Sequence, residues 1–556
     1  MAEITPMMKQ YLEIKEQNKD SILFFRLGDF YEMFNEDAQL ASRELDLTLT
    51  TRDRGKAAED QTPMCGIPYH SSDAYIARLI AKGYKVAICE QTEDPALAKG
   101  LVKRDIIRVI TPGTVIDSAC LDDRRGNFLC GIFLDGQNAG AAFCDMTTGH
   151  THVTAFSGDD RAEHLYNELS RFSPAEAVLS AGAYDNGELV EYLRDKLSCA
   201  VERGENRFEL KACEKAIRAQ FGEERFASLP RNNPAAALAL GALLSYLHET
   251  QKTDLSYIKD LEYYEQGRFM ELDLSARRNL ELTETIRAKE KRGSLLWVLD
   301  KTKTAMGARN LRAWLTRPLR DVAAIERRLG AVEALTKNTV AREELILSLS
   351  GISDMERLIG RIAYGTAGGR DFASLRNSIE RITEVKAQLT AFTTGRLHEL
   401  DNELDTLTDV AQSIRDTLVD EPPFSVREGG FIRKGFNAEV DRLHEILSGG
   451  KGLLADIETR EKEKTGIRTL KIGYNKVFGY YIEVSNSFKD QVPDTYIRKQ
   501  TLVNGERYIT EELKNLEQEI LTAGDRDKAL EFEIFTALRE SVTAESVRIQ
   551  RAAGLI

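Results

Sequence analysis

The 556-residue sequence predicts a multidomain protein that combines mixed α/β domains with an all-helical domain. Its length exceeds the roughly 250 to 300 residues at which a single hydrophobic core stops growing. Strand and helix patterns alternate as far as about residue 255, whereas strand signals almost vanish between residues 256 and 427. A short β-hairpin pattern then lies between two amphipathic helical stretches. These observations predict about four domains.

The first domain is predicted as a small α/β unit over residues 1–109. A helix should begin after Thr5, because a cap-like threonine is followed by proline at the first helical position. Apolar residues from Ser21 predict a strand, and residues 72–81 and 85–89 predict a helix and a buried strand. The turn residues at 111–114 (TPGT) indicate a linker over residues 110–122.

Residues 123–255 are predicted to form a second α/β domain. Three strand patterns, at 128–134, 139–146 and 150–156, are separated by Gly, Asn and Asp turns, which favours a meander. Helical patterns follow up to about residue 255.

The remaining chain is predicted to be a helical domain with an insertion. Residues 256–427 form its first part, residues 428–505 the insertion and residues 506–556 the returning helix. Apolar spacings typical of a coiled-coil seam occur in two stretches, at Val440, Leu443, Leu447, Leu454 and Ile457, and at Ile509, Leu513, Leu516 and Ile520. At about 1.5 Å per residue, arms of some thirty residues would hold the hairpin pattern of residues 470–484 on the order of 40 Å from the helical core.

The composition excludes several classes of protein. With 42% hydrophobic and 30% charged residues and a net charge of -13, the chain is expected to be a folded cytoplasmic protein. Its start lacks an apolar signal core, and no run of 18 apolar residues occurs, so no membrane association is expected. The seven cysteines contain no C-x-x-C pair, which argues against disulfides and zinc.

Positive charge is concentrated in one stretch of this acidic chain. Residues 460–507 hold ten Lys/Arg against six Asp/Glu, a local excess of four. A basic tip on an acidic body is compatible with binding DNA at one end of the molecule.

No catalytic or metal-binding motif is found in the sequence. The phosphate-loop pattern G-x-x-x-x-G-K-[ST] does not occur, nor do G-x-S-x-G and H-E-x-x-H, and the histidines lack ligand-like spacing. We therefore expect a binding protein with no cofactor of its own, not a self-contained enzyme.

The most unusual local string is GDFYEMF at residues 28–34, directly after an apolar strand. Aromatic residues in strands usually fill cores. Strand alternation nevertheless puts Phe30, Glu32 and Phe34 on one face if Tyr31 and Met33 point inward. An exposed Phe would then lie two residues from a carboxylate.

This string resembles the Phe-x-Glu mismatch-reading motif of the MutS family of DNA mismatch repair proteins. The resemblance continues through ordered motifs along nearly the whole chain: PMCGIPYH at 63–70, AICEQ at 87–91, RVITPGT at 108–114, ARRNLEL at 276–282, TAMGARNLRAWL at 304–315, GYYI at 479–482 and RKQTL at 498–502.

The resemblance implies a mismatch-binding domain, an RNase H-like connector, and a long-helix lever domain with an inserted β-rich clamp. It implies a protein that binds mismatched or unpaired bases in duplex DNA by inserting a Phe wedge and kinking the duplex. The mismatch-reading pair maps onto Phe30 and Glu32. The candidate DNA-backbone contacts are Arg52 and Arg104 in the first domain and Lys471, Lys476, Arg498 and Lys499 in the clamp.

Full-length members of the family continue into a domain that binds and hydrolyses ATP with magnesium. They act as homodimers and work with a MutL-type partner. No phosphate loop occurs up to Ile556, so ATP chemistry is expected to lie outside these residues.

Two other classes remain open. A MutS-like clamp for recombination or branched DNA typically lacks the mismatch-reading motif, which is intact at residues 28–34. A scaffold that uses coiled-coil arms to hold protein partners would have no direct role on DNA.

Overall fold

The computed structural model describes residues 5–52, 61–93, 100–117, 120–204, 206–253, 255–265, 267, 269–425, 428–475 and 479–556. The chain divides into two compact units. Unit 1 consists of Met1–Thr366, Ser378–Leu407 and Glu545–Ile556, and unit 2 of Ala367–Asn377 and Thr408–Ala544. Within the described residues, every helix is too short or too polar to cross a membrane.

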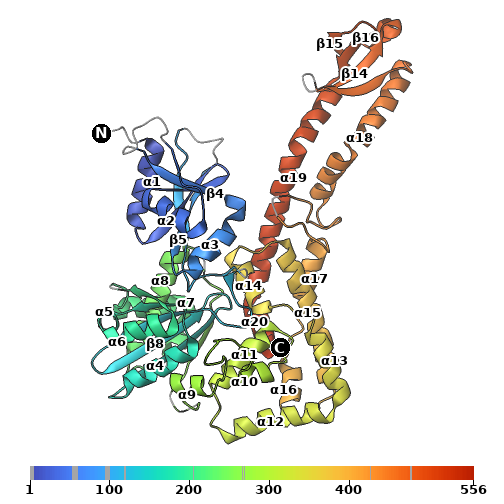
Figure 1. Cartoon of the computed structure of the whole chain (residues 1–556). Coiled ribbons are helices and arrows are strands. Elements are labelled where there is room, and N and C mark those ends of the chain that lie inside the picture. The colour runs from blue at the N-terminus through green and yellow to red at the C-terminus, as the bar shows by residue number, and fades with distance from the viewer. Residues whose placement is uncertain are drawn as a thin grey trace. The chain divides into compact units, whose positions relative to one another are not determined.

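The N-terminal part of unit 1 is a six-stranded mixed sheet in the order β3-β4-β2-β1-β5-β6. Strands β1 and β5 are parallel, and the other neighbours are antiparallel. Helices α2 and α3 cover the core on one face, and α1 covers the other (Figure 1). The elements are α1 (Pro6–Gln17), β1 (Ser21–Leu27), β2 (Phe30–Phe34), α2 (Asn35–Leu45), β3 (Thr50–Thr51), β4 (Pro63–Pro68), α3 (Ser72–Ala81), β5 (Lys85–Gln91) and β6 (Arg104–Ile110).

The predicted elements of this part are confirmed. Thr5 caps α1, since its side chain accepts a hydrogen bond from the Met8 backbone amide at 3.4 Å. The helix predicted at residues 72–81 is α3, and the strands predicted from Ser21 and Lys85 are β1 and β5.

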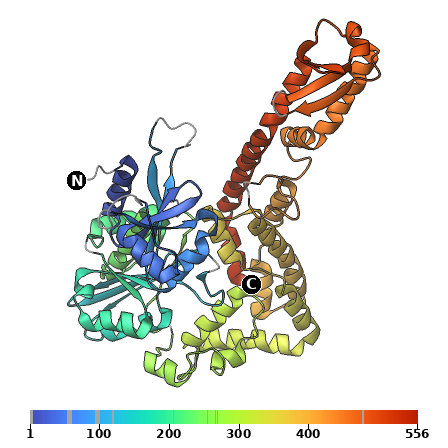
Figure 2. The ribbon, with the colours of Figure 1, turned by 45° about the horizontal axis from the view of Figure 1, so that its top comes forward.

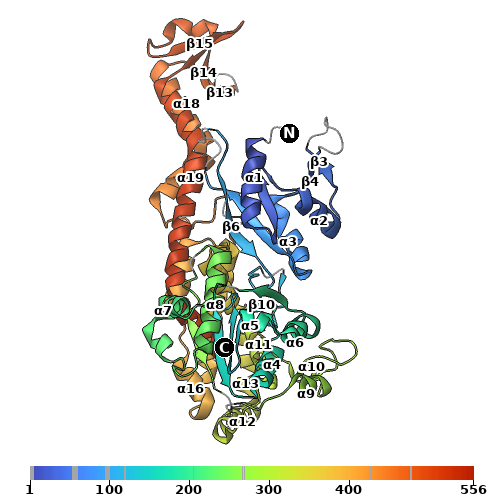
Figure 3. The same ribbon diagram turned by 90° about the vertical axis from the view of Figure 1, so that its left-hand side faces the viewer.

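The second sheet of unit 1 has the order β11-β10-β7-β8-β9-β12. The predicted meander is confirmed, because β8 pairs antiparallel with both β7 and β9. Strands β10, β11 and β12 add in parallel and were not predicted. Figure 3 shows α8 and the group α4, α5 and α6 on opposite faces. The elements are β7 (Phe128–Leu134), β8 (Asn138–Asp145), β9 (His150–Ser157), α4 (Arg161–Phe172), β10 (Glu176–Leu179), α5 (Ala181–Tyr184), α6 (Gly187–Glu191), β11 (Ala200–Arg203), α7 (Leu210–Ala227), α8 (Ala235–Gln251) and β12 (Asp260–Tyr263).

Two glycines let helix α8 lie directly on this sheet. A Cβ atom at Gly131 would stand 2.2 Å from the carbonyl oxygen of Ala239, and one at Gly140 would stand 2.1 Å from that of Ala235. Any side chain at either glycine would push the helix away, because packed cores do not yield by this amount without cost.

The linker predicted over residues 110–122 begins as a buried turn. Thr111 and Thr114 are both 0% exposed. The backbone amide of Gly113 donates to a carboxylate oxygen of Glu176 at 3.1 Å, and Tyr246 donates to the other at 2.6 Å. The turn therefore joins the two α/β parts through a hydrogen-bonded core.

The rest of unit 1 is largely helical, as predicted from residue 256 onward. Strand β12 is an exception, because it pairs with β9 and completes the second sheet. The helices are α9 (Leu274–Asn279), α10 (Leu295–Leu299), α11 (Ala305–Thr316), α12 (Val322–Lys337), α13 (Thr339–Leu349), α14 (Met355–Tyr364), α16 (Gly395–Glu403) and α20 (Ser546–Leu555), with α15 (Gly369–Leu389) contributing to both units.

Unit 2 carries a four-stranded antiparallel sheet at the end of two long antiparallel helices (Figure 2). Asn437 caps the first helix, since its side chain accepts hydrogen bonds from the backbone amides of Glu439 and Val440. The sheet order is β13-β14-β16-β15, and β13 and β14 form the predicted hairpin. The elements are α17 (Thr408–Thr417), α18 (Ala438–Thr465), β13 (Lys471–Asn475), β14 (Gly479–Ser485), β15 (Ile497–Thr501), β16 (Gly505–Ile509) and α19 (Glu511–Ala544).

The predicted seam between the arms needs two corrections. Leu447 is 45% exposed, and Ile446 instead packs with Leu443 and Ala523. Ile509 lies in strand β16, so the returning helix starts later than predicted. Ile446, one position before Leu447, makes the contact with α19 at this level, so the buried side chains there do not follow the predicted 3.5-residue spacing.

Candidate nucleic-acid interface

Strand β2 presents one large aromatic side chain at its first position. A two-residue loop joins β1 to β2, and Gly28 adopts φ +58°, a conformation that suits glycine in tight hairpins. Phe30 follows this loop and is 47% exposed, whereas Tyr31 and Met33 are buried beneath α2 and α3. The alternation predicted for this strand is therefore observed at Phe30.

Phe34 shares the face of Phe30 but is 0% exposed. Its ring packs edge-to-face on Tyr11 of α1, with ring centroids 4.9 Å apart. Helix α1 thus covers the far end of this face and leaves the end at Phe30 open. Phe30 is therefore the exposed aromatic side chain of a strand that pairs with β1 on one edge and with β4 on the other.

Glu32 lies between these two aromatics on the same face. Burial raises the pKa of its carboxyl, and the charge of Arg52 opposes that shift. No hydrogen-bond partner of the Glu32 carboxylate is found among residues with described placement. Gly66 stands opposite Glu32 in β4, and a Cβ there would come within 3.5 Å of Glu32 Cγ. The Glu32 side chain thus lies against β4 with its acceptor atoms available.

The two cations predicted in this domain have different environments. Arg52 is exposed, and its guanidinium lies 5.9 Å from the Phe34 ring on the face that carries Glu32. Arg104 is only 8% exposed. It donates to the Arg26 carbonyl of β1 at 2.7 Å and to the Val102 carbonyl at 2.9 Å, so its guanidinium is held within the domain instead of presenting its charge to a ligand.

The sheet of unit 2 displays three of the four predicted clamp cations. Lys471 is exposed on β13. The Arg498 side chain is 64% exposed and lies 3.3 Å from Glu506. The register shifts between Arg498 and Gln500, so exposed Lys499 occupies a bulge in an edge strand. The fourth candidate, Lys476, lies outside the described residues.

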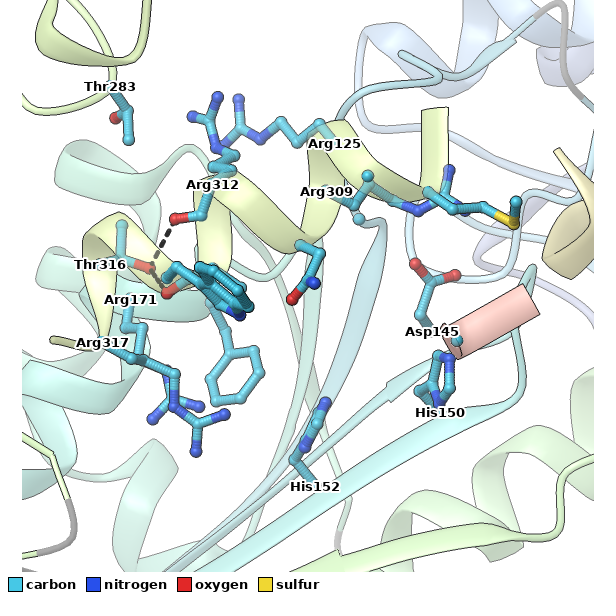
Figure 4. Close-up of a pocket in the computed structure, with 18 of the residues that line it drawn as sticks. Arg125, Asp145, His150, His152, Arg171, Thr283, Arg309, Arg312, Thr316 and Arg317 are labelled. Carbon is cyan, nitrogen blue, oxygen red and sulfur yellow. Dashed lines mark hydrogen bonds between the residues drawn. The ribbon is translucent and has the colours of Figure 1, made fainter. Parts of the chain in front are cut away.

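Unit 1 also contains an arginine-rich cavity of about 1410 Å³ that the sequence did not predict (Figure 4). Arg125 and Arg312 both line it. Burial lowers the pKa of Arg312, and the charge of Arg125 lowers it further. These residues come from segments far apart in the sequence. No local pattern marks them, so only the fold brings them together.

His150 forms an ion-paired cluster at the edge of this cavity. Its Nδ1 atom lies 2.7 Å from Asp260 and its Nε2 atom 3.3 Å from Glu356. Burial alone would lower the pKa of His150, but the hydrogen bonds to the two carboxylates outweigh it and raise the pKa to about 10. Arg309 also binds Glu356, so the cluster links the second sheet to α11 and α14.

All seven cysteines are free, and six of them are buried.

Comparison with known proteins assigns the chain to a family. Family models match residues 5–119 as MutS domain I, residues 127–259 as MutS domain II and residues 275–556 as MutS domain III. The chain belongs to the MutS family, which confirms the resemblance drawn from its motifs.

Curated relatives match over the whole chain. The DNA mismatch repair protein MutS of Acetivibrio thermocellus is 48% identical over 557 residues, covering 100% of this chain and 63% of that protein. The proteins of the same name from Lachnoclostridium phytofermentans and Alkaliphilus oremlandii are 45% and 46% identical, with 59% and 63% of their lengths covered. The chain therefore spans about three fifths of the length of these relatives.

Proposed function

We propose that this chain recognises mismatched or unpaired bases in duplex DNA, as the first step of DNA mismatch repair. The observation that carries the proposal is the pair on β2. A half-exposed Phe30 stands two residues from Glu32, a carboxylate with a raised pKa. Membership of the MutS family and the names of the relatives support the same function.

Phe30 acts as a wedge that enters the minor groove and kinks the duplex. Such a wedge must unstack a base step, which costs a few kcal/mol. A mismatched step is already poorly paired and more deformable, so the same insertion costs less there. Selectivity therefore arises from the mechanics of the DNA more than from the identity of its bases.

Glu32 acts as the partner of the displaced base. It accepts a hydrogen bond from a base N–H, or donates one when it is protonated, which its raised pKa favours. On a matched duplex the same carboxylate meets no free base edge, so its desolvation and its repulsion from the phosphates are not compensated. Glu32 thereby disfavours normal pairs.

The remaining contacts hold the DNA backbone. Arg52 lies on the face that carries Phe30 and Glu32. Lys471, Arg498 and Lys499 form a phosphate-binding surface on the sheet of unit 2, and Lys476 remains a prediction. Contacts of this kind position DNA without reading its sequence. The burial of Arg104 favours a structural role for that residue, so we leave it out of the proposed contacts.

The finer assignments of the family are proposed for this chain as well. The order β9-β8-β7-β10-β11 supports an RNase H-like connector, and the helical arms with their sheet support a lever domain with an inserted clamp. In a full-length protein, we propose that mismatch binding is coupled to ATP and magnesium, to homodimer formation and to a MutL-type partner.

The test is a gel-shift comparison of G·T mismatched, matched and branched duplexes of equal length. Preferential binding of the mismatched duplex supports the proposal. Preference for the branched duplex would assign the chain to the recombination class, and no binding to any duplex would favour a protein scaffold.

A further inference from the structure

Three side chains with metal-binding atoms meet between the two long helices of unit 2. His444 lies on α18, and Asp527 and Glu531 lie four residues apart on one face of α19. His444 Nε2 is 3.3 Å from Asp527 Oδ1 and 3.3 Å from Glu531 Oε1. No motif of the family resemblance includes these residues, and the proposed DNA contacts do not use them.

The two carboxylates are buried where charge is costly. Asp527 is 5% exposed and Glu531 is 0% exposed. Burial raises the pKa of both, and for Glu531 the neighbouring Asp527 raises it further. Isolated buried carboxylates are strongly unfavourable unless a cation or hydrogen-bond donors compensate them.

The compensation within the protein is uneven. Glu531 accepts from the backbone amides of Gly430 at 2.6 Å and Ile432 at 3.4 Å, which fix its orientation. Asp527 Oδ1 is buried, and among the described residues its close polar contact is His444 Nε2 at 3.3 Å, without a well-aligned hydrogen bond. Lys528, the nearby cation that affects Asp527, is exposed. Asp527 Oδ1 is therefore an acceptor atom that could bind an ion placed between His444, Asp527 and Glu531.

The distances from His444 Nε2 to the two carboxylate oxygens fit a tetrahedral ion, and all three ligand atoms lie within 4.8 Å of one another. Zinc binds imidazole nitrogen and carboxylate oxygen at about 2.0–2.2 Å, so neighbouring ligand atoms of a tetrahedron lie about 3.3–3.5 Å apart. Both distances from His444 Nε2 match this value. An imidazole ligand favours zinc and similar transition metals, whereas magnesium prefers oxygen ligands alone.

We propose that His444, Asp527 and Glu531 bind a divalent transition-metal ion of the zinc type and thereby cross-link α18 to α19. The side chain of His444 is 34% exposed, which gives the ion a route from solvent and leaves room for a water as fourth ligand. The backbone amides around Glu531 supply the outer contacts that orient a ligating carboxylate. The ion would fix the spacing of the two arms that carry the small sheet.

The test is zinc titration of the purified, chelator-treated 556-residue chain by calorimetry. We expect about one ion per chain, and a rise in Tm with zinc but not with equal magnesium, because binding to the folded state stabilises it. Asp527→Asn and His444→Gln should each weaken zinc binding at least tenfold. Loss of an outer contact of a metal ligand already costs about 10- to 100-fold in affinity, so loss of a ligand should cost no less. Asp525→Asn, an exposed change on the same helix, should leave binding unaltered.

A cobalt spectrum of the unaltered chain provides a second measurement that needs no variant to fold. Tetrahedral cobalt bound by nitrogen and oxygen gives visible bands without the near-ultraviolet charge-transfer band of a thiolate. A thiolate band would assign the ion to cysteine and overturn the proposal. Absence of saturable zinc binding, or equal binding in the Asp527 and His444 variants, would also overturn it and leave direct contacts of His444 with the two carboxylates as the role of the cluster.

Discussion

The exposed ring of Phe30 offers the most direct test of the proposed wedge. Phe30→Ala removes a side chain that is 47% exposed, so only about half of a normal burial is lost. Because full burial of a Phe is worth about 1.5–3 kcal/mol, we expect the free energy of unfolding to fall by roughly 1 kcal/mol. The fold should therefore survive the substitution.

The effect on DNA should be larger and selective. Stacking of a base on an aromatic side chain contributes about 1–3 kcal/mol. Since 1.4 kcal/mol is about tenfold in affinity, Phe30→Ala should weaken binding to a G·T duplex by roughly 5- to 150-fold. Matched-duplex affinity should change little, because the wedge is not stably inserted there. Fluorescence anisotropy on both duplexes measures the two affinities.

Phe34→Ala is the matched control, because it removes the same side chain from the same strand and face. Phe34 is 0% exposed, so its loss should cost about 3–5 kcal/mol of unfolding free energy. The wedge assignment for Phe30 is refuted if Phe30→Ala costs as much stability as Phe34→Ala, or if it preserves the preference for the mismatch.

Three further substitutions test other sites. Replacing Arg498 and Lys499 with Ala should weaken matched and mismatched binding alike and flatten the salt dependence by up to about two units, whereas an unchanged slope would remove both from the interface. Glu32→Gln should lower the preference for the G·T duplex. Because the pKa of Glu32 is raised in the folded state, ionisation of this carboxyl destabilises the fold. The Tm of the variant should therefore exceed that of the wild type by more at pH 7 than at pH 4. His150→Gln should lower Tm most below about pH 6.5, the pKa of His in the unfolded chain. This loss of Tm should shrink as the pH rises towards about 10, the pKa of His150 in the folded protein. A loss of Tm that does not depend on pH would show that the ion pairs of His150 are not its cause.

The sequence predicted elements most accurately where local rules govern the chain. The Thr5 cap, the helix Ser72–Ala81 and the meander of the second sheet each follow from a few neighbouring residues. The exposure of Phe30 was also predictable, because a strand alternates and the loop before it is short.

Features set by distant packing were not predictable in the same way. The burial of Phe34 and Arg104 depends on how α1 and β1 pack against their side chains. Strand β12 pairs with β9, which lies more than a hundred residues earlier in the chain. The Arg125 and Arg312 cavity and the His444 cluster draw on residues from separate segments, and no spacing rule links such positions.

The insertion of the small sheet between α18 and α19 has a consequence for the order of folding of unit 2. The segment between Thr465 and Glu511 separates the two helices in the sequence. For the helices to meet, this segment must close into a loop, and the chain entropy lost on closure is offset only once contacts between the helices have formed. The hairpin of β13 and β14 is local, and the sheet core around Tyr496 joins the two helix ends directly. We therefore expect the sheet to form before the two helices pair along their length, so that a destabilised sheet would slow the folding of unit 2.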